Sequence, residues 1–82
     1  MDDARLVVAL EDALAKLGVP LRVEPLESRG GLVRLKGVPQ VLLAEHATPK
    51  ERIAVLAAAL AKLDTTSLFL APAVRAAIER YG

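Results

Sequence analysis

The segment TPKERIAVLAAALAKL, residues 48–63, carries the strongest structural signal in the chain, because it predicts a helix that is apolar on almost every side. Thr48 is a favourable N-cap, Pro49 suits the first helical position, and Glu51 completes a capping box three residues after the cap. No residue from Ile53 to Ala61 is polar. We expect such a helix to be covered on more than one side, by its own domain or by a partner.

A further helix is predicted near each end of the chain. Asp2 and Asp3 suit the positive end of a helix, leucines recur behind them at helical spacing, and Gly18 followed by Pro20 ends the pattern. The last helix begins at Pro72 and has one apolar side. Just before it, the run 68–70 (LFL) is expected to enter the core as an apolar plug.

Three strands are predicted between the first two helices, over residues 21–24, 32–36 and 40–45. Glycines in 27–31 and 37–39 mark turns, so the strands are expected to form an antiparallel meander. In the middle strand, Val33 and Leu35 share one face and the basic residues at 34 and 36 share the other. The predicted fold is α+β, one domain over residues 1–82: a three-stranded antiparallel meander packed against three helices in the order α-β-β-β-α-α.

Composition narrows the classes of function. The 82 residues include 11 Lys or Arg and 10 Asp or Glu, for a net charge of +1, and only two aromatic residues. Neither a clustered basic footprint nor a stacking platform for nucleic acid is evident. The chain has no cysteine, begins with acidic rather than basic residues, and has no apolar run long enough to cross a membrane. We expect a cytoplasmic protein with no membrane segment.

No motif for catalysis or metal binding is evident. His46 is the only histidine, and the carboxylates available to accompany it are scattered, which makes a poor set of ligands for a transition metal. Ser28 lies beside Arg29-Gly30-Gly31 but lacks the flanking glycines of a nucleophile elbow. We therefore predict that the protein is not an enzyme and carries no cofactor.

A helix, three strands and a capped helix beginning with PKER (residues 49–52) resemble the zinc-metallopeptidase fold of the family that cleaves phage repressors and regulates radiation responses. That family has an H-E-x-x-H signature on this helix. The matching positions here are Ala58, Ala59 and Lys62, so the resemblance implies a zinc-free scaffold and no catalytic residue. The pattern GGLVRL (30–35) with PAVR (72–75) also resembles short bacterial proteins, and implies no function.

The apolar helix offers the first candidate site. Ile53 and Leu56 can serve the core, while Val55, Ala58, Ala59 and Lys62 lie on a different side, where small residues would allow close approach of another element. A helix of the same chain, a second copy, or a different protein could cover this surface. The leading prediction is a non-enzymatic protein-interaction module that self-associates, as a homodimer, through an aliphatic helix or sheet surface.

The second candidate is a basic strip on the sheet. Arg34 and Lys36 are expected on one strand face, and Arg22 on the neighbouring strand would join them, with Glu24 partly neutralising the group. The alternative function is therefore a regulatory domain that binds nucleic acid or an acidic partner through Arg22, Arg34 and Lys36. Nucleic acid is the less favoured partner.

Overall fold

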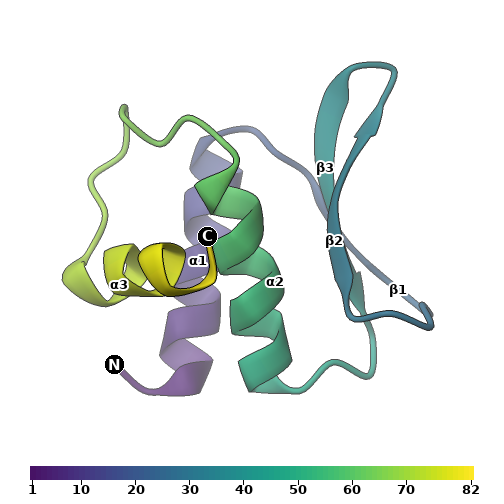
Figure 1. The fold of residues 1–82 in the computed structure, drawn as a ribbon, viewed down its shortest axis with the longest axis horizontal. Coiled ribbons are helices and arrows are strands. Elements are labelled where there is room, and N and C mark those ends of the chain that lie inside the picture. The colour runs from purple at the N-terminus through teal and green to yellow at the C-terminus, as the bar shows by residue number, and fades with distance from the viewer.

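The computed structural model describes residues 1–82 and contains three helices and a three-stranded sheet (Figure 1). The elements in chain order are α1 (Asp3–Lys16), β1 (Leu21–Glu24), β2 (Gly30–Leu35), β3 (Val38–Ala44), α2 (Pro49–Ala61) and α3 (Pro72–Tyr81). The predicted α+β class and the order of the elements are confirmed.

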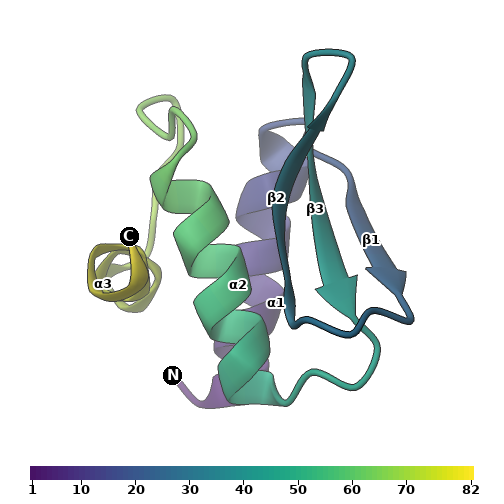
Figure 2. The ribbon, with the colours of Figure 1, turned by 45° about the vertical axis from the view of Figure 1, so that its right-hand side comes forward.

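Helix α2 lies at the centre of the molecule, between the sheet on one side and α3 on the other (Figures 1 and 2). Helix α1 runs beside α2 in the same direction, and at their N-terminal ends Lys50 Nζ lies 3.3 Å from an Asp3 carboxylate oxygen. Seventeen residues are buried, and all of them are hydrophobic. The apolar surface of α2 is thus covered on several sides by its own chain.

The predicted helix caps are present. The Asp2 side chain accepts a hydrogen bond from the Arg5 backbone N–H at 2.8 Å. Thr48 and Glu51 form the reciprocal capping box, in which the Thr48 N–H donates to Glu51 Oε1 at 2.9 Å and the Glu51 N–H donates to Thr48 Oγ1 at 3.2 Å. These bonds satisfy backbone donors that a helix leaves unpaired at its start, so both helices begin where the sequence indicates.

The predicted meander is wrong, because the sheet is mixed and its order is β1-β3-β2. Strand β3 is central; β1 pairs with it in parallel and β2 pairs with it antiparallel. The β2–β3 connection is a two-residue turn in which Lys36 and Gly37 have φ of 52° and 81°. Such a turn matches the twist of paired strands, whereas Pro25 and the next four residues form no tight turn, so β1 reaches the other side of β3.

Pro39 lies within β3 although proline cannot donate a ladder hydrogen bond. In a central strand, the backbone N–H and C=O groups of one residue point toward one neighbouring strand, and those of the next residue point toward the other. The N–H groups of Val41 and Glu45 donate to the β1 side, at the carbonyl oxygens of Pro20 and Glu24. Residue 39 faces that same side, but β1 pairing begins only opposite Val41. The missing donor of Pro39 therefore costs no strand pairing.

The predicted plug is wrong at its central residue. Leu68 and Leu70 are partly buried against the core, but the side chain of Phe69 is 85% exposed. An extended segment turns successive side chains to opposite sides, so two leucines facing the protein leave Phe69 facing outward. Residues 68–70 cover the core rather than enter it.

Candidate interaction surfaces

The surface predicted on α2 is largely closed by the protein itself. Val55 and Ala59 are 6% and 2% exposed, Ala58 is partly buried, and Lys62 is exposed. Strand β2 and the residue before it lie against this side of α2. The sequence left three possible covers for this surface: a helix of the same chain, a second copy, or a different protein. In the structure the cover comes from the same chain, and it is strand β2 rather than a helix.

A groove of about 200 Å³ remains between β2 and α2. Its lining on the β2 side is Arg29, Gly30, Gly31 and Leu32, and on the α2 side Ala54, Val55, Ala58, Ala59 and Lys62. Alanines leave space that larger side chains would fill. All four residues of the predicted α2 surface thus line one groove at the edge of the sheet.

The outer face of the sheet carries no covering element, and Figures 1 and 2 both show it open to solvent. Directly paired residues share a face, and Val41, which is fully buried on the helix side, pairs with Leu32. The intervening pairs therefore face outward: Gly31 with Leu42, Val33 with Gln40, and Leu35 with Val38. Leu35 and Val38 are 53% and 51% exposed. We call Val33, Leu35, Val38 and Leu42 the outer apolar face.

The predicted basic strip is not a single surface. Arg22 pairs with Leu42 and so lies on the outer side, where its guanidinium is 2.8 Å from a Glu24 carboxylate oxygen. Arg34 pairs with Pro39 and so lies on the helix side. Lys36 occupies the hairpin turn. The register therefore separates the three cations, and Glu24 neutralises one of them.

His46 and Arg52 hold the loop that precedes α2. The His46 Nε2 atom lies 2.8 Å from the carbonyl oxygen of Leu26, which joins this loop to the one after β1. The Arg52 guanidinium donates to the carbonyl oxygens of Ala47 and Glu45, at 3.0 and 3.1 Å. No group of three His, Asp or Glu side chains is placed to hold a metal ion. These polar side chains act as structural ties between loops.

Two carboxyl groups have lowered pKa values, and both belong to local turns. The hydrogen bond from the Thr48 backbone, followed by that from its side chain, lowers the pKa of Glu51 below its ordinary value of 4.5. The Thr66 side chain and backbone lower the pKa of Asp64 in the same way, with oxygen and nitrogen at 2.7 and 3.0 Å from Asp64 Oδ1. Bonds to the charged form favour that form. Neither group is poised for proton transfer near neutral pH.

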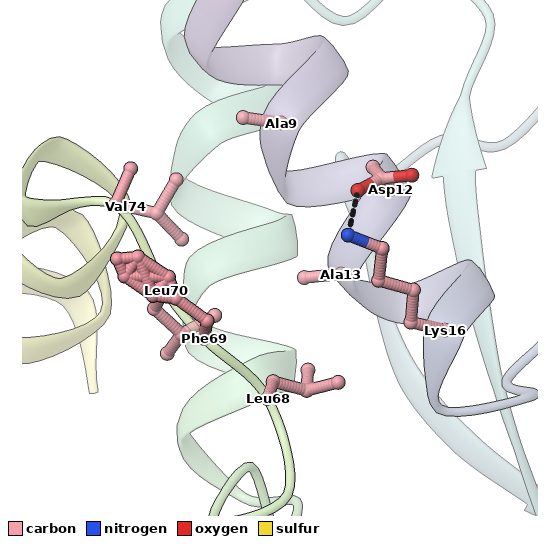
Figure 3. A pocket seen from close by; sticks show the side chains of 9 residues that line it. Ala9, Asp12, Ala13, Lys16, Leu68, Phe69, Leu70 and Val74 are labelled. Carbon is pink, nitrogen blue, oxygen red and sulfur yellow. Dashed lines mark ion pairs between the residues drawn. The ribbon is translucent and has the colours of Figure 1, made fainter.

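A separate pocket of about 140 Å³ lies between α1 and the segment before α3 (Figure 3). Leu68, Leu70 and Val74 form one wall, and α1 supplies the other, with an ion pair of 3.0 Å between Lys16 and Asp12 at its rim. No buried polar side chain is present anywhere in the protein. Small-molecule sites usually contain a few placed polar groups, and the charged side chains at this pocket, Asp12 and Lys16, are paired with each other.

No known protein-family model, curated protein sequence or solved structure matches this chain. The resemblance to the metallopeptidase scaffold therefore stays a prediction. None of the helices is both long and apolar enough to cross a lipid bilayer.

Sequence reasoning missed the outer apolar face and the groove beside β2. The signal that could have revealed the face is the dipeptide Lys36-Gly37, because a two-residue turn there makes Leu35 and Val38 the first pair of the hairpin. No local signal places β2 at the edge of the sheet beside α2, since that position follows from the pairing of β1 with β3.

Proposed function

We propose that this protein is a non-enzymatic interaction module that forms a homodimer through its outer apolar face. The observation that carries the proposal is the exposure of Leu35 and Val38, each more than half accessible, on a sheet face that no helix covers. Contiguous exposed apolar side chains of this kind mark sites of protein association.

The charges around the face favour a second copy as the partner. Its four apolar residues surround the neutral Gln40, and Arg22 and Glu24, which share the outer side of the sheet, form an ion pair of 2.8 Å. In a two-fold dimer each surface meets itself, so a strongly charged patch would repel its own copy. A neutral apolar face avoids that repulsion.

The size of the face sets the expected affinity. Three strands of this length present roughly 14 Å by 20 Å of sheet. A standard interface buries about 800 Å² on each partner, which is about one sixth of the 5118 Å² accessible surface of this chain. The sheet face alone falls short of that area, so we expect a weak dimer with a dissociation constant in the micromolar range.

Light scattering coupled to gel filtration, over a hundredfold range of concentration, tests the proposal. The expected mass rises from 8.7 kDa toward twice that value as concentration increases. Val38→Glu should keep the protein monomeric throughout, because it places a charge among the exposed apolar side chains of the proposed interface.

Val8→Glu is the matched control, since Val8 is exposed on α1, away from the sheet face. This variant should dimerise like the unmodified protein, and circular dichroism should show both variants folded. A monomer at every concentration, or a dimer that Val8→Glu abolishes while Val38→Glu leaves it intact, would contradict the proposal.

A further inference from the structure

The free edge of β2 presents unpaired backbone groups beside the groove. Arg29 is bonded to β3 through its carbonyl oxygen, which accepts from the Ala44 N–H at 2.9 Å. Along an edge strand, residues whose backbone groups bond to the neighbouring strand alternate with residues whose backbone groups do not. The backbone N–H and C=O groups of residues 29, 31, 33 and 35 therefore point toward β3. The N–H and C=O groups of Gly30, Leu32 and Arg34 therefore point away from the sheet.

The other edge of the sheet is protected by comparison. Strand β1 has only four residues, lies between Pro20 and Pro25, and carries the Arg22–Glu24 ion pair. Short length, prolines and charges are the usual means by which proteins block unwanted strand pairing. Strand β2 is longer and contains no proline. Of the two edges, β2 is the one open to an added strand.

The groove beside this edge is apolar in its middle and cationic at its margins. Leu32, Val55 and the three alanines of α2 supply the apolar part, and Arg29 and Lys62 supply the charges. Neither cation has a carboxylate within salt-bridge distance, and no acidic residue lines the groove. Glu51, which is close enough to Arg29 for their charges to interact, is already bonded to Thr48.

We propose that the groove between β2 and α2 binds an extended acidic peptide segment that joins the sheet as a fourth strand alongside β2. The backbone of the segment pairs with the free groups of Gly30, Leu32 and Arg34. Alternate side chains enter the groove, where alanines leave room for aliphatic groups. Carboxylates at the two ends pair with Arg29 and Lys62, and Arg34 continues the same face of β2 as a third cation.

This site is independent of the proposed dimer. The groove lies on the helix side of the sheet and at its edge, whereas the dimer surface is the outer face. An extended segment advances by the same distance per residue as the strand beside it, about 3.3 Å, so a segment of about seven residues covers the six residues of β2 and extends slightly past them. The chemistry that fits is acidic at both ends and aliphatic between, with a period of two.

The test uses a fluorescent peptide, EEVAVEE with blocked ends, and follows its anisotropy during titration with the protein at low salt. The peptide KKVAVKK serves as the charge-reversed control. We expect saturable binding of the first peptide only, weakened by added salt because the carboxylates contact exposed cations.

Two charge reversals locate the site. Arg29→Glu and Lys62→Glu should each weaken binding by about tenfold or more, because each turns an attraction into a repulsion. Arg75→Glu is the matched control: Arg75 is exposed on α3 and unpaired, so the net charge changes equally at a distance from the groove. This control should change binding by less than about twofold.

Arg34→Pro and Arg34→Ala distinguish strand addition from charge attraction alone. Both variants remove the cation, but only proline removes the outward N–H, and that N–H takes no part in the pairing with β3. Arg34→Pro should bind the peptide more weakly than Arg34→Ala.

Four outcomes would overturn the proposal. They are no binding of the acidic peptide at low salt, equal binding of the lysine peptide, loss in Arg75→Glu equal to that in Arg29→Glu, and equal binding by Arg34→Pro and Arg34→Ala. Val38→Glu, which tests the dimer, should bind the peptide unchanged, so failure of one proposal is distinguishable from failure of the other.

Discussion

Gly30 lies so close to the backbone of Leu42 that a β carbon at residue 30 would overlap the Leu42 carbonyl group. Its φ of 118° is also in the region that favours glycine. This close approach allows β2 to lie flat against β3 where the chain enters the strand. Gly31, the next residue, has open space around its α carbon and no positive φ.

The two neighbouring glycines should therefore respond differently to alanine. We expect Gly30→Ala to lower the free energy of unfolding by at least about 2 kcal/mol, from overlap with the strand backbone and from backbone strain. Gly31→Ala should change it by less than about 1 kcal/mol. Urea denaturation of both variants measures the difference, and equal losses would show that the Gly30–Leu42 contact does not constrain the strand.

Ala59→Glu should unfold the protein rather than merely dissociate it. Ala59 is 2% exposed between α2 and β2, so the longer, charged side chain would be forced into a position with almost no accessible surface. We expect a loss of more than about 3 kcal/mol. Ala61→Glu, on the exposed side of the same helix, is the control and should remain folded by circular dichroism. A folded Ala59→Glu would mean that β2 does not cover α2 in solution.

Acid should weaken the start of α2 through Glu51. The backbone and side-chain bonds from Thr48 lower its pKa in the folded protein relative to 4.5. A lowered folded pKa gives stability that is present above the unfolded value and disappears as pH falls through the folded value. At neutral pH the unmodified protein should melt at a higher temperature than Glu51→Gln.

That difference in melting temperature should shrink as pH falls below 4.5, because the amide introduced by Glu51→Gln does not titrate. Thermal melts at intervals between about pH 3 and pH 7 check this expectation. Two curves that remain parallel over the whole range would contradict a role for the Glu51 carboxylate in the cap.

Phe69→Ala should have almost no effect on stability, although Phe69 is the largest apolar side chain in its segment. Because it is 85% exposed, we expect a change within about 0.5 kcal/mol. Leu10→Ala, at a fully buried position on α1, should cost about 3 kcal/mol. Denaturation of the two variants under one set of conditions makes the comparison, and a large loss for Phe69→Ala would place that ring in the core after all.

The helices could be predicted because their signals are local. Asp2, Thr48 and Pro72 mark helix starts through bonds or backbone angles that involve only the next few residues. The sheet could not be predicted in the same way, since alternation of side chains separates two faces without stating which strands are neighbours. Two glycines at 30 and 31 favour a hairpin turn, yet the hairpin forms at Lys36-Gly37 and Gly30 serves a close backbone contact.

The predictions of the candidate sites depended on the predicted arrangement of the strands, and they failed where that arrangement was wrong. Placing Arg22 and Arg34 on one surface required the strands of a meander, and the actual register puts them on opposite faces. The sequence indicated that the apolar residues of α2 need a cover, and Val55 and Ala59 are buried. The strand that covers them, β2, was predicted as the middle strand of a meander rather than as the strand beside α2. Leu32 pairs with the buried Val41, so its side chain lies on the helix side of the sheet. Side chains alternate along a strand, so those of Val33 and Leu35 lie on the outer side.

The central position of β3 also affects the order in which the chain can assemble during synthesis. Leu21–Glu24 finds its partner only in Val41–Ala44, about twenty residues further along. Since a ribosome delivers the chain from its N-terminus, β1 emerges with nothing to pair with. The backbone groups of β1 therefore stay hydrogen-bonded to water until the β2–β3 hairpin has left the exit tunnel of the ribosome.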